Sequence, residues 1–226
     1  MPSRTAVAAN VRPRSAGAKA RKERERSARR HEIVHAARAV FAEKGFANAT
    51  LEEIAERAGF GKGTVYNYFE SKETLFSAAI ADLLDDVTAI ARDVSVMDLP
   101  IREALTEYVK RMIAYYEANF DFCRMMMSEW VRPELEGVAC PIGQIHARIQ
   151  MVAEPLAQLF KSAMRRRLIR RSDPMILAKM FIGIVHDYYV MNMVPPLPAK
   201  TVRAQTEMIV SVFFEGIVAT ATRAKA

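Results

Sequence analysis

The stretch that decides the fold is AVFAEKGFANATLEEIAERAGFGKGTVYNYFESKETLF, residues 39–76. Counted from Leu51, apolar residues recur where two short crossing helices must bury side chains against each other. These residues are Ile54, Ala58, Phe60, Val65 and Tyr68. Ala55 is small enough to let the second helix approach closely, and Gly59 can take the positive φ that a tight turn between helices requires. The spacing predicts a helix-turn-helix.

The ends of these two helices carry further signals. Thr50 is a good N-cap for the first helix, and Glu53 three residues later completes a capping box. The second helix, expected over residues 62–69, exposes polar side chains that can donate to phosphates or base edges. These are Lys62, Thr64, Tyr66 and Asn67. Glycine beside a lysine can also suggest nucleotide binding, but neither the P-loop spacing nor a preceding strand is present.

The chain before the motif is strongly basic. Residues 1–30 hold ten Lys or Arg and two Glu, a net charge of +8, whereas the whole chain carries +7. Residues 1–20 lack apolar periodicity, so we expect a flexible arm that meets phosphates, or else a solvated tail. Order is expected from about Arg26. Apolar residues then recur at helical spacing between Ile33 and Phe41, and Gly45 is placed to end that helix.

The chain after the motif repeats the helical pattern. Helices are expected at about 72–92, 100–118, 121–132, 142–168, 174–193 and 202–222, separated by proline-containing breaks. No convincing pairs of alternating strands occur, so the predicted fold is all-α. We find no membrane-spanning stretch and no signal-peptide core, and expect a cytoplasmic protein. Cys123 and Cys140 lack the spacing of a disulfide framework or a metal site.

Residues 39–76 resemble the DNA-binding segment of the TetR/AcrR family of transcriptional regulators. The matching elements are Phe41, Gly45-Phe46, Thr50, Ile54-Ala55, Ala58-Gly59, Gly63-Thr64, Tyr66, Tyr68-Phe69, Lys72 and Leu75. The resemblance implies a three-helix DNA-binding domain at residues 26–76, preceded by a disordered basic arm at 1–25. It also implies a larger helical domain for effector binding and dimerisation at 77–226. Such a protein is a regulator and not an enzyme, and needs no cofactor.

The family's DNA contacts carry over where residues match. The residues expected to contact DNA are Thr50, Lys62, Gly63, Thr64, Tyr66, Asn67 and Lys72. Lys72 and Tyr66 would mainly hold phosphates. Family members often have Ser or Thr at the N-cap of the second helix, where this chain has Gly61, so one hydroxyl contact to phosphate is lost.

Methionine and aromatic residues are dense in the middle of the larger part, which suits an apolar pocket between helices. The residues expected to line it are Tyr108, Met112, Tyr115, Phe122, Met126, Trp130 and Phe181. An ordinary hydrophobic core is the alternative interpretation of the same side chains. The resemblance implies a repressor that a small, largely apolar ligand releases from a palindromic operator in double-stranded DNA.

The last two predicted helices are apolar on more than one face, so each needs more than one partner. In TetR-like proteins the last two long helices pair with those of a second subunit. The residues expected at this interface of a homodimer are Val185, Tyr188, Met208, Val212 and Phe213. A two-fold dimer also doubles the contact with a palindromic site.

Other hypotheses stay open at this point. A helical enzyme would need a nucleophile and base or a metal cluster, and the sequence offers no recognisable one. The run Arg165–Arg171 could be a membrane-surface or second nucleic-acid patch, or cations at a helix C-terminus. His146 and His186 could sense pH or bind a ligand, and Cys123 and Cys140 could sense oxidants.

Overall fold

The structure is a computed structural model, and it describes residues 14–130, 142–190 and 201–217. These ranges contain α-helices and no strand, which confirms the predicted all-α class. The helices are α1 (Arg14–Asn48), α2 (Leu51–Arg57), α3 (Lys62–Tyr66), α4 (Lys72–Ser95), α5 (Ile101–Ala118), α6 (Phe120–Trp130), α7 (Ile142–Arg165), α8 (Pro174–Val190) and α9 (Val202–Ile217). From α4 onward, each begins within one residue of its predicted start.

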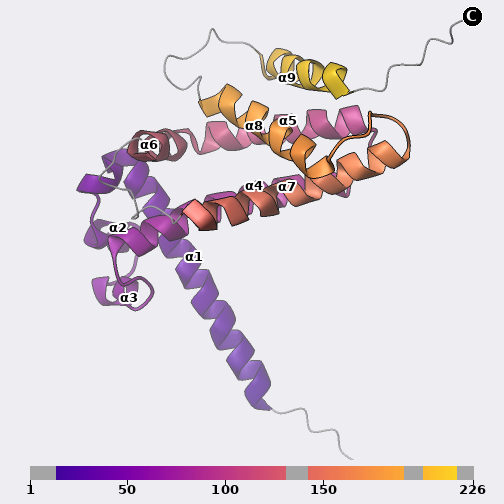
Figure 1. The fold of residues 1–226 in the computed structure, drawn as a ribbon. Helices are drawn as coiled ribbons and strands as arrows, with labels where there is room; N and C mark the ends of the chain where they lie inside the picture. The colour runs from indigo at the N-terminus through magenta and orange to yellow at the C-terminus, as the bar shows by residue number, and fades with distance from the viewer. Residues whose placement is uncertain (1–13, 131–141, 191–200, 218–226) are drawn as a thin grey trace, which may run out of the picture.

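The helices form two parts, as Figure 1 shows. Helices α1, α2 and α3 form a small head at one end, and helices α4 to α9 form an elongated body. Helix α4 runs from the head along the body and packs against α7, which in turn packs against α8. Helix α9 packs mainly against α5. The head touches the body where α1 contacts α4 and α6.

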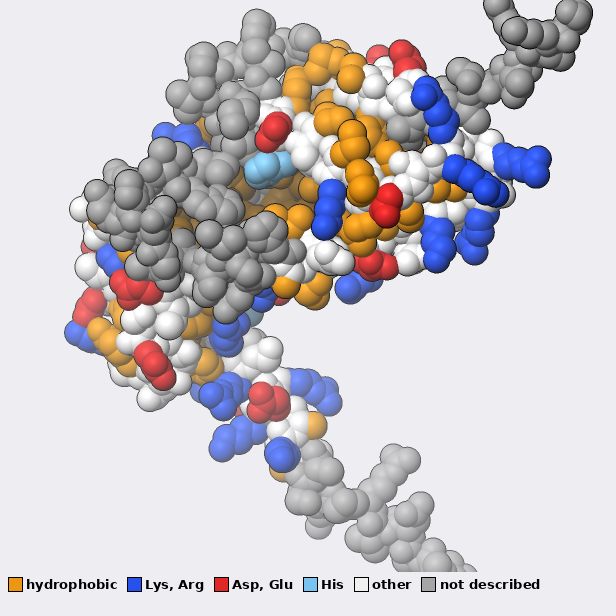
Figure 2. Space-filling view, viewed as in Figure 1, with side chains coloured by type: hydrophobic (Ala, Val, Ile, Leu, Met, Phe, Trp, Pro, Cys, Tyr) orange, Lys and Arg blue, Asp and Glu red, His pale blue; other side chains and the backbone are white. Residues whose placement is uncertain are grey.

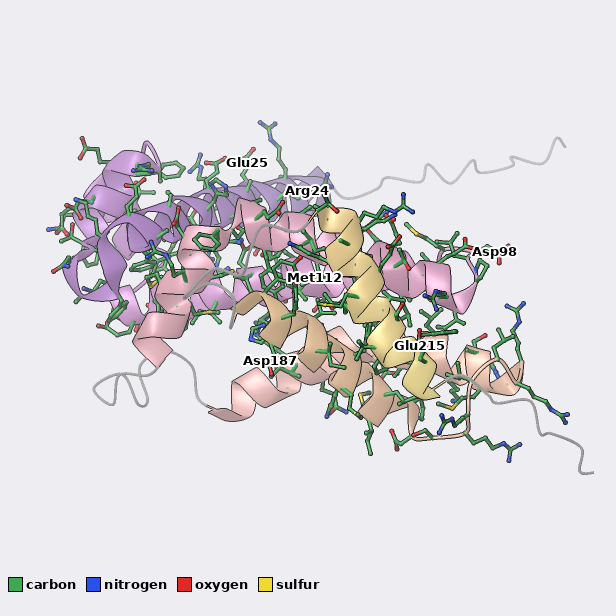
Figure 3. The ribbon with its side chains drawn as sticks, turned by 90° about the horizontal axis from the view of Figure 1, so that it is seen from above. Arg24, Glu25, Asp98, Met112, Asp187 and Glu215 are labelled. Carbon is green, nitrogen blue, oxygen red and sulfur yellow. The ribbon has the colours of Figure 1, made fainter. Side chains whose placement is uncertain are left out.

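Helix α1 begins earlier than expected. Residues 14–25 form its first turns, where the sequence suggested a disordered arm, and every described side chain from Gly17 to Glu32 is exposed. The segment is rich in Ala, Arg, Lys and Glu, which have high helix propensity, and Arg21 pairs with Glu25 one turn later at 2.9 Å. Local preference therefore explains the helix without burial, and Figures 1 and 3 show it projecting from the head with Arg24 and Glu25 on its surface.

Gly45 breaks α1 as predicted, but the chain resumes helical geometry up to Asn48. Its φ of 76° and ψ of 166° are non-helical, and a side chain there would be strained. The bend carries Phe46 back into the head, where its ring lies 5.9 Å from Phe41 and 4.9 Å from Phe76 of α4. This aromatic cluster joins the head to the first turn of α4.

The body has an aromatic cluster of its own. Phe181 of α8 lies 4.8 Å from Phe213 of α9 and 6.4 Å from Phe160 of α7, measured between ring centroids. All three rings are buried. Large aromatic side chains contribute much of the apolar burial that stabilises a core, so this cluster fixes α7, α8 and α9 against one another.

The basic run at residues 165–171 follows the end of α7. Arg165 lies in the last helical turn, and Arg167 takes a positive φ of 58°. The backbone N–H of Leu168 donates to Ala163, and that of Arg167 donates to Met164, which closes the helix with a Schellman turn. The basic run therefore begins at the C-terminus of α7, where cations complement the helix macrodipole. This position fits the second interpretation that the sequence offered for the run, cations at a helix C-terminus. Figure 2 shows Lys and Arg gathered on the projecting helix and at the opposite end of the body.

Candidate functional site

The turn between α2 and α3 has the geometry that the sequence predicts. Thr50 accepts a hydrogen bond from the Glu53 backbone N–H, and the Glu53 carboxylate accepts one from the Thr50 N–H, both at 3.2 Å. Gly59 has a φ of 71°, and the Phe60 N–H returns to the Ala55 carbonyl at 2.9 Å. Capping and turn together orient α3 relative to α2.

Helix α3 presents one buried face and one exposed face. Val65 is fully buried, and Phe69 beyond the helix is buried too. Lys62, Gly63, Tyr66 and Asn67 are exposed and Thr64 is half-buried, so the structure brings these five predicted DNA contacts onto one surface. The helix is shorter than predicted, because it ends at Tyr66 and its C-cap is Asn67.

The exposed face of α3 is electrostatically tied to α2. Lys62 forms an ion pair with Glu52, and its ammonium lies 5.7 Å from the centre of the Tyr66 ring. The hydrogen bond from Lys62 lowers the pKa of Glu52, and the same bond raises the pKa of Lys62. Lys62 is therefore cationic at neutral pH and positioned beside Tyr66. To contact a phosphate, its ammonium has to leave Glu52 or bind the phosphate and Glu52 at the same time.

Two of the predicted DNA contacts also have structural partners. Lys72 donates to the Ala47 carbonyl at 2.9 Å and stands 4.7 Å from the centre of the Phe46 ring. The Thr50 hydroxyl is engaged in the capping box. Lys72 therefore ties the start of α4 to the end of α1, and Thr50 fixes the start of α2. Sequence reasoning predicted the Thr50 capping box but missed the Lys72 bond, because that bond joins residues 25 positions apart.

The largest feature that the sequence did not reveal is a buried arginine between head and body. The guanidinium of Arg38 in α1 donates to Asp82 and Asp86 of α4, each at 3.0 Å. It also donates to the Tyr115 hydroxyl at 3.0 Å and to Asn119 Oδ1 at 2.5 Å. We call these five residues the Arg38 network. Burial by itself lowers the pKa of Arg38, but the surrounding groups outweigh it and leave the pKa raised.

Tyr115 therefore differs from its predicted role. Its hydroxyl accepts from Arg38 and donates to Asp86 Oδ2 at 2.9 Å, so it belongs to the Arg38 network and does not line the apolar cavity described below. The available signal was Arg38 itself, a cation inside the apolar stripe from Ile33 to Phe41. An open, polar recess of about 800 Å³ lies beside the network, between α1, α4 and the start of α6.

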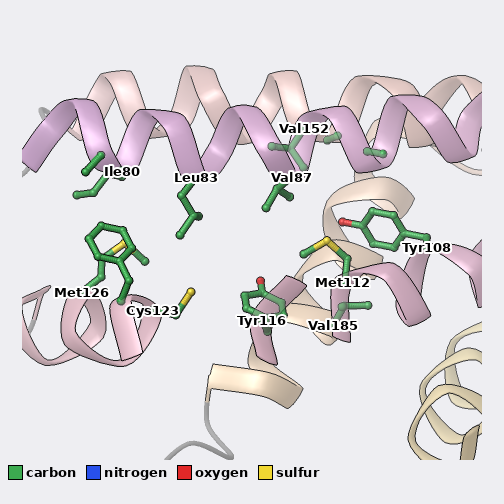
Figure 4. Close-up of a cluster of buried hydrophobic side chains, with 14 of the residues drawn as sticks. Ile80, Leu83, Val87, Tyr108, Met112, Tyr116, Cys123, Met126, Val152 and Val185 are labelled. Atoms are coloured by element: carbon green, nitrogen blue, oxygen red, sulfur yellow. The ribbon is translucent and has the colours of Figure 1, made fainter. Parts of the chain in front are cut away.

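An apolar cavity of about 230 Å³ lies in the body. Its lining residues come from α4 to α8 and are mostly aliphatic: Ile80, Leu83, Leu84, Val87, Tyr116, Cys123, Met126, Ile149, Val152, Lys179, Ile182, Gly183 and His186. Figure 4 shows several of them around the space between α4 and the facing helices, and Figure 2 shows a hollow of hydrophobic side chains with a histidine in view.

Of the predicted pocket residues, Met126 lines this cavity. Tyr108, Met112, Phe122 and Phe181 are buried in the surrounding core but do not line it. The Trp130 side chain, like those of Cys140 and His146, lies outside the described part of the structure. Sequence reasoning missed the aliphatic walls because Leu and Val at helical spacing look alike in a core and in a pocket.

Polar groups in the cavity are few and mostly neutral. The Tyr116 hydroxyl lies 3.0 Å from His186 Nδ1, and burial lowers the pKa of His186, so its imidazole is neutral at neutral pH. Burial raises the pKa of the Cys123 thiol to about 11, which keeps it protonated and unreactive. Among the described lining residues, Lys179 is the cation.

The predicted interface residues divide into two groups. Val185 and Phe213 are buried inside the chain, because Phe213 packs into the aromatic cluster with Phe181, so they differ from the expectation of a contact with a partner. Tyr188 and Met208 are half-buried, and Val212 is 68% exposed. Ile176 and Met180, one turn apart on α8, are each 55% exposed and were not predicted.

Membrane-spanning helices and metal-binding clusters are both absent from the described residues. No helix there is both long and apolar enough to span a bilayer. No group of three or more His, Cys, Asp or Glu side chains there could hold a metal ion.

Part of the chain matches a known protein family. The family model for bacterial regulatory proteins of the tetR family matches residues 33–79. The chain is 24% identical over 192 residues to the uncharacterized transcriptional regulator YhgD of Bacillus subtilis, covering 79% of this chain and 92% of YhgD. It is 33% identical over 84 residues to the repressor KstR2 of Rhodococcus jostii, covering 37% of this chain and 41% of KstR2.

A solved structure shares the fold. The regulator FadR of Bacillus subtilis, in complex with stearoyl-CoA, matches with a TM-score of 0.66 and 17% identity, over 83% of this chain and 98% of FadR. The helix-turn-helix, the helical body and these matches agree with one another. Residues 33–79 belong to the tetR family of bacterial regulatory proteins, and most of the chain shares the fold of solved TetR-family regulators.

Proposed function

We propose that the protein is a dimeric repressor that binds a palindromic operator and is released when a small, largely apolar ligand enters the body. The observation that carries this proposal is the exposed polar face of α3, set by a capped and glycine-closed turn, on a body that holds an apolar cavity. We place the arm at residues 1–25, the DNA-binding domain at 26–76 and the effector and dimerisation domain at 77–226.

The proposed DNA contacts divide by position. Lys62, Thr64 and Asn67 are on the face that would enter a major groove and meet base edges, and Gly63 lets the helix N-terminus approach closely. Tyr66, Thr50 and Lys72 would hold phosphates at the rim. The hydrogen bond from Lys72 to the Ala47 carbonyl would also help, because it holds in place the edge of the head that contacts the phosphate.

Dimerisation is proposed through α8 and α9. Ile176, Met180 and Val212 are large apolar side chains that stay exposed in the single chain. Burying them against a second copy would remove apolar surface from water, and a two-fold pair would present two α3 helices to one operator. Tyr188 and Met208, both half-buried, would complete the contact.

Ligand control is proposed through the apolar cavity. A protein of the same fold, FadR of Bacillus subtilis, was solved in complex with stearoyl-CoA, which supports an effector with a long apolar chain. To shift DNA binding a hundredfold, a ligand must bind the DNA-incompetent state more tightly by about 3 kcal/mol. The cavity touches α4 and α6, the two body helices that α1 contacts, so its occupancy has a direct route to the head.

The test measures how the purified protein binds DNA duplexes taken from upstream of its own gene. Fluorescence anisotropy reports the binding at several salt concentrations. Lys62→Ala and Tyr66→Ala should each weaken operator binding roughly tenfold or more. Lys110→Ala, an exposed lysine on α5, is the matched control and should change nothing. Absence of sequence-selective, salt-sensitive binding by the unaltered protein would refute the proposal.

The arm has a separate test. Deleting residues 1–25 removes a net charge of +5, counted as seven Lys or Arg and two Glu. Binding should weaken and its salt dependence should flatten, because fewer counterions are released, while operator preference persists. Loss of operator preference would mean that the arm also reads sequence.

A further inference from the structure

The hydroxyl of Tyr108 is buried with no hydrogen-bond partner among the described residues. The side chain is 0% exposed. A buried polar group left unpaired is unfavourable, and most buried hydroxyls in proteins have a partner. Phenylalanine would fill the same space without this cost, so the hydroxyl calls for an explanation.

Tyr108 shares one face of α5 with two other residues. Met112 follows one turn later and Tyr116 one turn after that, and side chains four residues apart lie above one another on a helix. Tyr116 lines the apolar cavity, as does Val87 on the facing helix α4. Figure 4 shows the hydroxyl end of Tyr108 directed toward Met112 and Val87, along the same space between helices.

Met112 stands between this hydroxyl and the cavity. Figure 3 places it in the middle of the body, and it is 2% exposed. Methionine is unbranched and flexible, so it can change rotamer and open a passage at small cost. The Tyr108 ring is held by Phe181, whose centroid lies 5.7 Å away, so its hydroxyl keeps its direction when Met112 moves.

The chemistry of the hydroxyl limits what it can bind. Burial raises the pKa of Tyr108 far above neutrality, so the phenol stays protonated and donates. Its proton has no acceptor among the described residues, so an acceptor is the partner that would satisfy it. A carboxylate would be deprived of water there, and Lys179, the cation among the described lining residues, already donates to Gln150 at 3.3 Å. A neutral oxygen, such as a ketone, ester or hydroxyl, meets the requirement.

We propose that Tyr108 is the deep ligand-binding residue of the body, and that the effector is an elongated apolar molecule with a neutral oxygen acceptor at its buried end. This proposal rests on the proposed function, since it names the ligand class of the same cavity. Met112 moves aside as the ligand enters, and the Tyr108 hydroxyl then gains the hydrogen bond that the unliganded protein does not give it.

The experiment compares two probes of equal shape, 2-nonanone and 2-methyl-1-nonene, in which a C=CH₂ group replaces the C=O group. Affinities are measured by calorimetry for the full-length protein and for Tyr108→Phe. The unaltered protein should prefer the ketone by about tenfold, and Tyr108→Phe should abolish that preference while binding the alkene equally well. Tyr189→Phe, whose hydroxyl bonds Gln205 between α8 and α9, is the matched control and should keep the preference.

Two further measurements make the result independent of affinity alone. The carbonyl stretch of bound 2-nonanone should shift to lower frequency in the unaltered protein and return in Tyr108→Phe. Thermal unfolding of unliganded Tyr108→Phe should occur at the same temperature or higher, because the substitution removes an unpaired polar group.

The outcomes separate this proposal from the one on which it rests. Equal affinity for both probes in the unaltered protein, or failure of both to bind, overturns the assignment of Tyr108. Operator binding without either probe is measured in parallel, and its absence would count against the proposed function. Operator release by the alkene as readily as by the ketone would keep ligand control and reject the oxygen acceptor.

Discussion

The head and the body of this protein hold their helices in different ways. In the head, α2 has 7 residues and α3 has 5, lengths at which an isolated helix does not form in water. In the body, α4 and α7 have 24 residues each and pack along their length. The short helices depend on single residues at caps and turns, whereas the long ones depend on many interchangeable apolar contacts. A single substitution should therefore matter more in the head.

The largest effect is expected at the Arg38 network, where head and body meet through a buried cation. Arg38→Met removes the guanidinium and leaves Asp82 and Asp86 facing each other without their shared cation. We expect the free energy of unfolding to fall by about 3 kcal/mol, as for other broken buried pairs whose partners keep some contact with water. Urea unfolding measures it. Arg21→Met, which breaks an exposed pair, is the control, and an equal loss there would contradict the importance of burial.

The next effect concerns the turn of the head. Gly59→Ala places a side chain at a φ of 71° and should cost about 1–2 kcal/mol in unfolding free energy. Gly63→Ala is the matched control, because Gly63 lies inside α3 without a positive φ and a Cβ there meets open space. That control should leave stability unchanged or raise it by up to about 1 kcal/mol. Similar losses in both variants would show that the turn is not the decisive element.

A smaller effect is expected at the cap of α2. Thr50→Ala removes the side-chain acceptor of the capping box and should lower the unfolding free energy by about 1 kcal/mol. Thr50→Ser keeps an acceptor in the same place and should recover most of the loss. Calorimetry on both variants checks the prediction, and no difference between them would mean that the cap contributes little.

The smallest effect is expected in the body, in how the stability of the protein depends on pH. Burial lowers the pKa of His186, so the folded state favours the neutral imidazole. Its contribution to stability is fully present above the ordinary pKa of about 6.5 and is lost as pH falls through the lowered value. Thermal unfolding should therefore be less sensitive to acid in His186→Asn than in the unaltered protein. Equal acid sensitivity would place the titrating group elsewhere.

The difference between the head, which depends on single residues, and the body, which depends on many apolar contacts, also decides what could be predicted from the sequence. Thr50, Glu53 and Gly59 act through neighbours within a few residues, and their roles were predictable from spacing alone. The starts of α4 to α9 were predictable, because apolar periodicity runs through each helix and prolines mark the breaks between them. The N-terminal turns of α1 were missed because they bury nothing, and the absence of an apolar stripe was read as absence of a helix.

Contacts between distant residues could not be predicted. Arg38 meets partners 44 to 81 positions away, and no local pattern records such a distance. Tyr115 and Tyr116 are adjacent aromatic residues of one dense cluster, yet one belongs to the Arg38 network and the other lines the cavity. Which of the two faces the cavity depends on how α5 is rotated against α4, and that is set by the packing of the whole body.

The Arg38 network has a consequence for exchanging parts between relatives. A head joined to the body of another family member just after residue 76 would bring Arg38 without Asp82, Asp86, Tyr115 and Asn119. The transplanted head would then carry a buried cation that its new body was not built to receive. Chimeric regulators with this head should therefore retain α4 of this chain as far as Asp86 and the two partners at the end of α5, or else replace Arg38.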